Sequence, residues 1–160
     1  MNERENFINI SAQMKQSSIL RPIDWEKNRE RIEKMVRQGT RSYTKSYLVE
    51  DYYLRLFYYG TVFSETIFYI GELDCYLSFE IEGKELHLFD ILSNQEISLK
   101  DTIQYLPLDN IEKIYCHFDV TNQESDVIKE VQVCDDDALF VRGIEPSQLE
   151  EIKLPLFNHA

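Results

Sequence analysis

Residues 75–92, CYLSFEIEGKELHLFDIL, decide the fold. Apolar and polar side chains alternate on both sides of residues 82–85, EGKE, and a period of two is that of β-strands. Gly83 supplies the flexible position of a tight turn, so the stretch predicts an antiparallel hairpin. Residues 66–72, TIFYIGE, are rich in β-forming side chains and add one more strand. We therefore expect a three-strand antiparallel meander over residues 66–92.

Two amphipathic helices are predicted before the meander. The first begins after Asp24, a favourable N-cap residue, and ends at Gly39, a common residue just past a helix end. The second ends at Gly60. Its apolar stripe comprises Val49, Tyr52, Tyr53, Leu56 and Phe57. Residues 6–10, NFINI, predict a short first strand, and residues 1–22 as a whole are expected to form a partly mobile N-terminal arm.

Helix and strand signals continue after the meander. Ser98 is expected to cap a helix from residue 99 to about residue 106, with Asp101 completing a capping-box pair, and Pro107 ends this helix. Further strands are predicted at residues 111–119, 126–133 and 138–143. This order indicates a single α+β domain over residues 1–160, built on a mixed, mostly antiparallel sheet with helices on both faces.

The charge of the chain limits its partners. Its 160 residues include 29 acidic and 17 basic side chains, for a formal net charge of −12. Such a surface is repelled by nucleic-acid backbone and by anionic lipid. The densest basic stretch, residues 27–41, is interleaved with Glu30 and Glu33 and reads as a solvated helix face. We expect neither nucleic acid nor membrane as a partner; the acidic surface suits a basic protein, or serves solubility.

Cysteines and histidines give no sign of a metal site. The three cysteines, Cys75, Cys116 and Cys134, lack metal-ligand spacing, and the three histidines are scattered along the chain. The sequence also lacks an apolar run of the length of a signal peptide or a membrane span. These observations predict a reduced, cytoplasmic protein without a metal.

The order of elements resembles that of the GCN5-related N-acetyltransferase (GNAT) superfamily. There, a short strand and two helices precede a three-strand meander, and a strand-to-helix elbow follows. Residues 74–92, DCYLSFEIEGKELHLFDIL, are similar to the paired central strands of many such proteins. Residues 40–60, TRSYTKSYLVEDYYLRLFYYG, are similar to the stretch that leads into the meander of degenerate GNAT-like halves in larger acetyltransferases. The resemblance implies a GNAT-like fold, acetyl-CoA as cofactor and an amine as acyl acceptor.

The elbow of this chain, residues 93–98, reads SNQEIS. In the family the elbow binds the acyl-CoA pyrophosphate, because its glycines let backbone N–H groups wrap the phosphates. The resemblance therefore implies a cofactor site at Ile91, Leu92, Ser93, Gln95 and Ser98. The glycines are missing here, and Glu96 adds negative charge where phosphates would sit. The chain is then either a divergent N-acyltransferase or a catalytically degenerate binding relative.

Three residues are candidates for catalysis if the chain is an acyltransferase. Glu80 and Asp90 lie on the two central strands, where a carboxylate can take a proton from an acceptor amine. Strand alternation places Asp90 on the face of Leu88 and opposite His87, where a carboxylate needs a partner or an open pocket. Tyr115 is among the tyrosines nearest in sequence to the one that protonates the leaving thiolate in the family. For each candidate a structural, hydrogen-bonded role is the alternative.

A second class of function stays open, that of a non-enzymatic acidic interaction protein of the immunity or inhibitor type. Its charges would come from the acidic turn at residues 134–137 and from Glu145, Glu150 and Glu151. Tyrosines would anchor the partner, and adjacent Tyr52 and Tyr53 cannot both face inward from a helix. An opening between two central parallel strands, lined by elbow N–H groups, would favour the enzyme, whereas a closed elbow would favour the interaction protein.

Overall fold

A computed structural model describes residues 2–9, 20–42, 51–120 and 127–133. Residues 2–9 and 127–133 are described as backbone strands alone. Several predictions concern residues outside these ranges, namely residues 1 and 10–19 of the N-terminal arm, the strand at residues 138–143, and the acidic turn with the glutamates that follow it.

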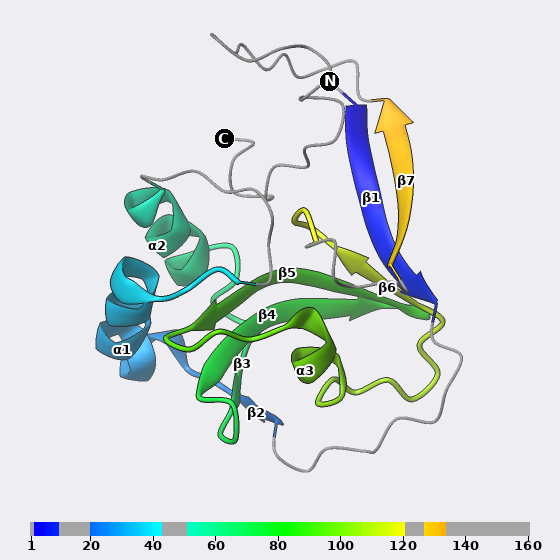
Figure 1. The fold of residues 1–160 in the computed structure, drawn as a ribbon. Coiled ribbons are helices and arrows are strands. Elements are labelled where there is room, and N and C mark those ends of the chain that lie inside the picture. The colour runs from blue at the N-terminus through cyan, green and yellow to red at the C-terminus, as the bar shows by residue number, and fades with distance from the viewer. Residues whose placement is uncertain (1, 10–19, 43–50, 121–126, 134–160) are drawn as a thin grey trace, which may run out of the picture.

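The described residues form one mixed sheet with three helices (Figure 1). The helices are α1 (Trp25–Gln38), α2 (Tyr52–Gly60) and α3 (Leu99–Ile103). The strands are β1 (Asn2–Asn9), β2 (Leu20–Pro22), β3 (Ile67–Ile70), β4 (Cys75–Glu82), β5 (Glu85–Ser93), β6 (Lys113–Cys116) and β7 (Val127–Val133). Their spatial order is β2-β3-β4-β5-β6-β1-β7, and β5 and β6 run parallel while the other neighbours are antiparallel. The predicted α+β fold and the meander β3-β4-β5 are confirmed.

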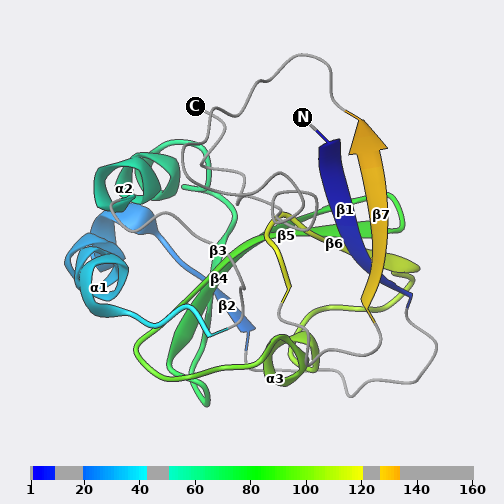
Figure 2. The same ribbon diagram turned by 45° about the horizontal axis from the view of Figure 1, so that its top comes forward.

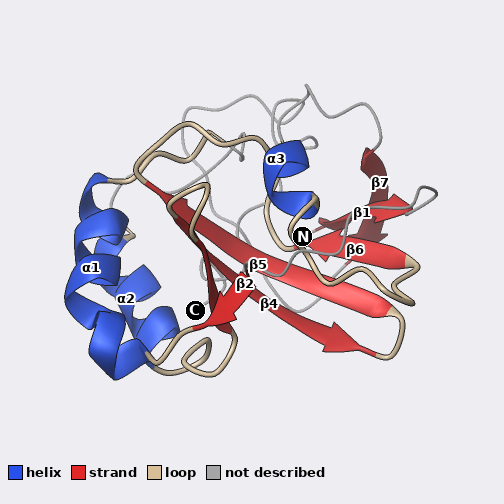
Figure 3. Cartoon of the chain, turned by 90° about the horizontal axis from the view of Figure 1, so that it is seen from below, coloured by secondary structure: helices blue, strands red, loops and turns tan. Residues whose placement is uncertain are grey.

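Two apolar clusters cover the two faces of the sheet. One joins β4 and β5 to α3 through Leu77, Leu88 and Leu99. The other joins the same strands to α1 and α2 through Ile32, Tyr59 and other large side chains. Figures 2 and 3 show α1 and α2 side by side at one end of the sheet, away from β1 and β7. Because both faces of the sheet are covered, odd-numbered and even-numbered side chains alike are buried in the first half of β4.

A β-bulge at Phe89 corrects the expected orientation of Asp90. Ser78 pairs with Asp90 but its neighbour Phe79 pairs with Leu88, so Phe89 is an extra residue in β5. A bulge of one residue reverses the alternation of the strand beyond it. Asp90 therefore lies on the same face as His87, toward α1 and α2, and not on the face of Leu88 as the alternation predicted.

The apolar stripe predicted for α2 is partly wrong in phase, since Tyr52 and Leu56 pack against the core as expected but Tyr53 and Phe57 do not. Tyr53 and Phe57 are 84% and 58% exposed, while Arg55 and Tyr59 are buried. The reason is that β5 presents the Asp90 carboxylate to this helix, and the arginine satisfies it, which a count of apolar residues cannot detect. The expectation that one tyrosine of the pair Tyr52 and Tyr53 is exposed is confirmed.

The helix ends follow the predicted caps with two differences. The Asp24 side chain accepts a hydrogen bond from the backbone N–H of Lys27, as an N-cap does. Gly39 follows α1 but has an extended backbone, with φ −67°, and its N–H donates to the Met35 carbonyl. Helix α3 is shorter than predicted and ends at Ile103. None of the helices in the described ranges is long and apolar enough to cross a membrane.

Candidate functional site

The elbow after β5 is fastened to the segment that follows α1. The Thr40 N–H donates to the Ser93 carbonyl at 2.8 Å, and the Thr40 hydroxyl donates to the Gln95 carbonyl at 2.7 Å. The Ser42 hydroxyl donates to the Ile97 carbonyl at 2.9 Å. The Thr40–Ser93 contact is an isolated antiparallel bridge, and the hydroxyls of Thr40 and Ser42 fasten the next part of the elbow to the same segment.

Gly39 permits this close approach. A Cβ atom at this position would lie 2.6 Å from the Ser93 carbonyl oxygen and would also overlap the Met35 carbonyl. Both neighbours are backbone atoms, which cannot rotate away. The sequence pattern indicates only a helix end at Gly39, and the missing side chain of this residue is the local feature that fits the docking.

Several backbone N–H groups of the elbow already have acceptors within the chain. The Gln95 N–H donates to the Ser93 hydroxyl at 2.9 Å, and the Ile97 N–H donates to the Ser42 hydroxyl at 2.8 Å. The Ser98 N–H faces the Asp101 carboxylate, and Ser98 caps α3 in the predicted capping box. An anion at this elbow would have to displace these oxygens.

The predicted cofactor residues lie around this elbow but are engaged in the fold. Ile91 and Leu92 are buried in the two opposite cores. Ser93, Gln95 and Ser98 contribute the hydrogen bonds described above, and Ser93 is also buried. Their role toward a cofactor stays a prediction.

A cavity of about 510 Å³ opens beside the elbow, within the size range of small-molecule pockets. At its wall Arg41 and Asp51 form a bidentate ion pair, with 2.7 Å between Nη1 and Oδ2. The Arg37 guanidinium stacks 4.7 Å from the centre of the Tyr52 ring and donates to its hydroxyl. Exposed Glu96 also lines the cavity. The lining thus combines two guanidinium groups, two carboxylates and an aromatic ring.

Asp90, a predicted catalytic residue, belongs to a buried network between β5 and α2. Its Oδ2 accepts hydrogen bonds from Arg55 at 2.7 Å and from the Tyr59 hydroxyl at 2.8 Å. All three side chains are buried. A carboxylate held in this way neutralises a buried arginine, which is a structural use of the charge.

Glu80 and Tyr115, the other two predicted catalytic residues, share a row with His87 across three strands. Glu80 pairs with His87, and His87 pairs with Tyr115. The His87 and Tyr115 rings stack with 5.1 Å between their centres, and the Tyr115 hydroxyl donates to Glu85 at 3.3 Å. The structure therefore brings Glu80 and Tyr115 together around His87 and keeps Asp90 apart in its own network.

The parallel ladder between β5 and β6 ends beside this row. Its last pair is Leu88 with Cys116, and the His117 N–H donates to the Leu88 carbonyl at 2.9 Å. Strand β5 continues beyond this point to Ser93 and pairs there with β4. The end of the ladder coincides with the bulge at Phe89, so the sheet changes its geometry where the polar row lies.

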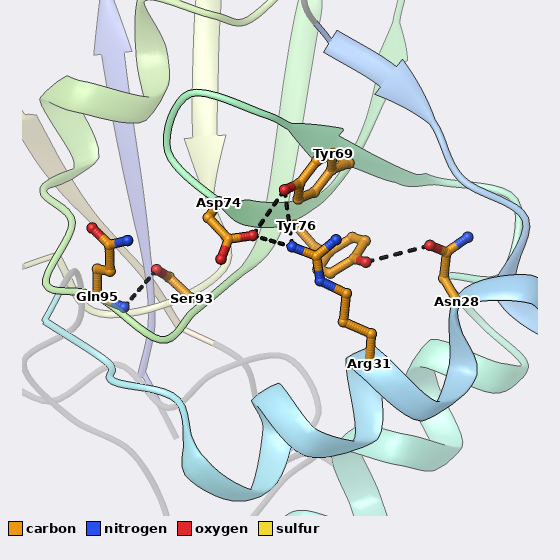
Figure 4. A network of polar contacts seen from close by, with 7 residues as sticks. All are labelled: Asn28, Arg31, Tyr69, Asp74, Tyr76, Ser93 and Gln95. Atoms are coloured by element: carbon orange, nitrogen blue, oxygen red, sulfur yellow. Dashed lines mark hydrogen bonds and ion pairs between the residues drawn. The ribbon is translucent and has the colours of Figure 1, made fainter.

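A second polar network joins α1 to β3, to β4 and to the turn between them (Figure 4). Arg31 stacks over Tyr69 and contacts both the Tyr69 hydroxyl and the Asp74 carboxylate. The Tyr69 hydroxyl donates to Asp74 at 2.8 Å, and the Tyr76 hydroxyl donates to Asn28. Burial raises the pKa of both tyrosines above the ordinary value.

Nucleophile and metal sites are not evident in the part of the chain that the structure describes. Cys75 and Cys116 are buried, and burial raises the pKa of Cys75 to about 12. A thiol with such a pKa is inert at neutral pH. Among the described residues, no three histidine, cysteine or acidic side chains gather closely enough to hold a metal ion.

Comparison with known proteins supports the fold and leaves the activity open. The chain matches no protein-family model and no curated protein. A conserved protein of unknown function from Enterococcus faecalis V583, described as a probable N-acyltransferase, has a similar crystal structure. The two superpose with a TM-score of 0.51 at 10% sequence identity, over 82% of this chain and 38% of that protein. At this identity the likeness shows a shared α+β fold alone.

Proposed function

We propose that this chain is a GNAT-like domain that has lost the acyl-CoA pyrophosphate site and acts by binding a partner. The observation that carries the proposal is the elbow, whose N–H groups at Gln95, Ile97 and Ser98 donate to oxygens of the chain itself. In addition, the carboxylates of Glu96 and Asp101 lie where phosphate oxygens would need positive charge.

The binding face in this proposal is the outer side of α2. Its single charged side chain, Arg55, faces inward, whereas Tyr53 and Phe57 are exposed, as is Val62 in the turn that follows. A helix that presents only apolar groups to solvent is expected to be covered by a partner. Because the chain carries a net charge of −12, a basic protein is the partner that it would attract.

Thermal unfolding with acetyl-CoA and with CoA, each at millimolar concentration, tests the proposal. A ligand at about a hundred times its dissociation constant stabilises a protein by about 2.7 kcal/mol, which is several degrees in Tm. We expect no shift with either compound. A rise with both would contradict the loss of the site. Pantetheine, which lacks the pyrophosphate, serves as the matched probe. A rise in Tm with CoA but not with pantetheine would mean that the protein binds the phosphates, which contradicts the proposal.

A divergent, active N-acyltransferase is the second candidate, and one observation favours it. The parallel ladder stops at Leu88 while β5 continues, and the row of Glu80, His87 and Tyr115 lies at that junction. In this candidate, acyl-CoA would enter at the junction, and Glu80 would accept the proton of an amine. Release of free CoA thiol from acetyl-CoA in the presence of a panel of amines would support this candidate. The Glu80→Gln variant is then expected to slow the release without lowering Tm.

A further inference from the structure

His87 and His117 form a hydrogen-bonded imidazole pair at the end of the β5–β6 ladder. The His87 Nδ1 and His117 Nε2 atoms are 3.0 Å apart. The rings pack between two aromatic side chains, with His87 on Tyr115 and His117 on Phe89. The pair also flanks the hydrogen bond from the His117 N–H to the Leu88 carbonyl. Side chains and backbone therefore hold the two strands together at the same point.

The remaining ring nitrogen of His87 limits the protonation of this pair. His87 Nε2 is buried and has no hydrogen-bond partner among the described residues. In the neutral pair one N–H lies between the rings, and Nε2 can remain a bare lone pair. Adding one proton to the pair forces an N–H onto His87 Nε2, since the shared position holds only one hydrogen. A buried N–H without an acceptor is costly, and a second added proton breaks the hydrogen bond because both facing nitrogens then carry hydrogens.

Of the charged groups on the same face of the sheet, some favour protonation of the histidine pair and others oppose it. Glu80 on β4 and Glu85 on β5 favour a protonated pair, but Glu80 is exposed and Glu85 accepts from the Tyr115 hydroxyl. Lys113 on β6 opposes protonation, and its ammonium lies 5.9 Å from the centre of the Tyr115 ring. Asp90, on the side of α2, is neutralised by Arg55. Asp119, a buried carboxylate two residues after His117, also favours protonation. The buried Nε2 atom of His87 opposes protonation of the pair.

We propose that the His87–His117 pair is an acid-sensitive junction, which fastens β5 to β6 while it is neutral and loosens as the imidazoles take up protons. This proposal goes beyond the proposed function, because it requires neither acyl-CoA nor a partner. An unfolded chain protonates its histidines near pH 6.5. The folded state then binds fewer protons than the unfolded state, and folding weakens as the pH falls below that value.

Nitrogen NMR of the folded, uniformly ¹⁵N-labelled protein tests the pair directly. We expect a scalar coupling between His87 Nδ1 and His117 Nε2 at pH 7.5, and neutral-form chemical shifts for both rings at pH 6. The urea-unfolded chain at pH 6 supplies the reference, with mostly protonated rings. Independent titration of both rings near pH 6.5 without a coupling would overturn the proposal.

Denaturant unfolding as a function of pH measures the consequence. From pH 6.5 to 5.5 the unfolding equilibrium constant of the native chain is expected to rise about thirtyfold more than that of the His87→Gln/His117→Gln variant, because each of the two imidazoles that stay neutral in the folded state contributes about fivefold. Carboxylate titration is common to both proteins and cancels. An equal rise would refute the proposal.

The matched control for this measurement is His159→Gln, which removes the third histidine and is expected to behave as the native chain. If the double variant does not fold, amide exchange decides instead. Protection of the His117 N–H is then expected to drop at pH 5 relative to pH 7, after correction for intrinsic rates, while that of Leu77 between β3 and β5 persists. Unchanged relative protection of His117 would refute the loosening.

Discussion

The Asp90 carboxylate lies 2.7 Å from the Arg55 guanidinium, and both side chains are almost fully buried between β5 and α2. Breaking a buried ion pair by removing one charge leaves the other charge in an apolar environment. This relationship explains why α2 buries an arginine that lies outside its predicted apolar stripe, and it links the helix to the Asp90 carboxylate.

The Asp90→Asn variant tests this dependence. It keeps the size of the side chain and an acceptor for Tyr59, but leaves the Arg55 charge unpaired by Asp90. We expect the free energy of unfolding to drop by about 3–5 kcal/mol in urea denaturation. The control is Glu112→Gln, which removes the exposed ion pair with Lys84 and is expected to cost less than about 1 kcal/mol. Similar losses in the two variants would contradict the buried pair.

Gly39→Ala probes the docking of the elbow. The new Cβ would overlap the carbonyls of Met35 and Ser93, so either α1 or the elbow must shift. We expect a loss of about 1–3 kcal/mol in unfolding free energy, in line with overpacking elsewhere. Gly71→Ala is the matched control, because the nearest atom to its Cβ would be a Tyr69 ring carbon at 4.0 Å. A Gly39→Ala variant as stable as Gly71→Ala would show that the elbow is not held against this segment.

Stability should fall as the pH rises above 9. Burial raises the pKa of Cys75 from 9.0 to about 12, so between these values the unfolded chain loses a proton that the folded chain keeps. Fewer protons on the unfolded state mean a negative slope of unfolding free energy against pH, by up to about 1.4 kcal/mol per pH unit for one group. Cys75→Ala should make this slope shallower. Tyr69 and Tyr76 contribute in the same direction and remain in the variant. An unchanged slope would show that Cys75 ionises alike in both states.

We expect the exposed aromatic face of α2 to tolerate substitution in the isolated chain. Tyr53→Ser and Phe57→Ser, combined, should change the unfolding free energy by about 1 kcal/mol or less, because both side chains are exposed. Phe63→Ser is the contrasting variant, since Phe63 is buried and stacks on Phe89, and it should cost at least about 3 kcal/mol. A large loss from the first pair would mean that this face is covered within the chain, and the partner proposal would fail.

Much of the fold was predictable because its signals are local. Alternation in residues 75–92 indicates the hairpin, and Asp24 and Ser98 cap the helices that they were expected to cap. The phase of α2 was not predictable, since it depends on a carboxylate from a strand far along the chain. The three-residue strand β2 was likewise missed, because its pairing with β3 is tertiary.

The candidate site was predictable in position and less so in detail. The sequence placed the elbow, its missing glycines, and Glu80 and Asp90 on the two central strands, but it did not predict the row that Glu80 forms with Tyr115. It gave no sign that Thr40 and Ser42 would occupy the elbow, because short hydroxyl side chains in a polar linker have no distinctive pattern. The histidine pair was also missed, since His87 and His117 meet only when β5 and β6 align in parallel.

The extra residue Phe89 also affects how this chain can be aligned with others. Up to Leu88 the even-numbered residues of β5 lie on one face of the sheet, and from Asp90 onward the even-numbered residues lie on the other face. A homologue without the bulge would match the first half residue for residue and the second half only after a gap of one position. Gaps are ordinarily expected in surface loops. Comparisons that forbid gaps within strands would therefore pair Asp90 with core positions of other proteins and lose the likeness at the centre of the domain.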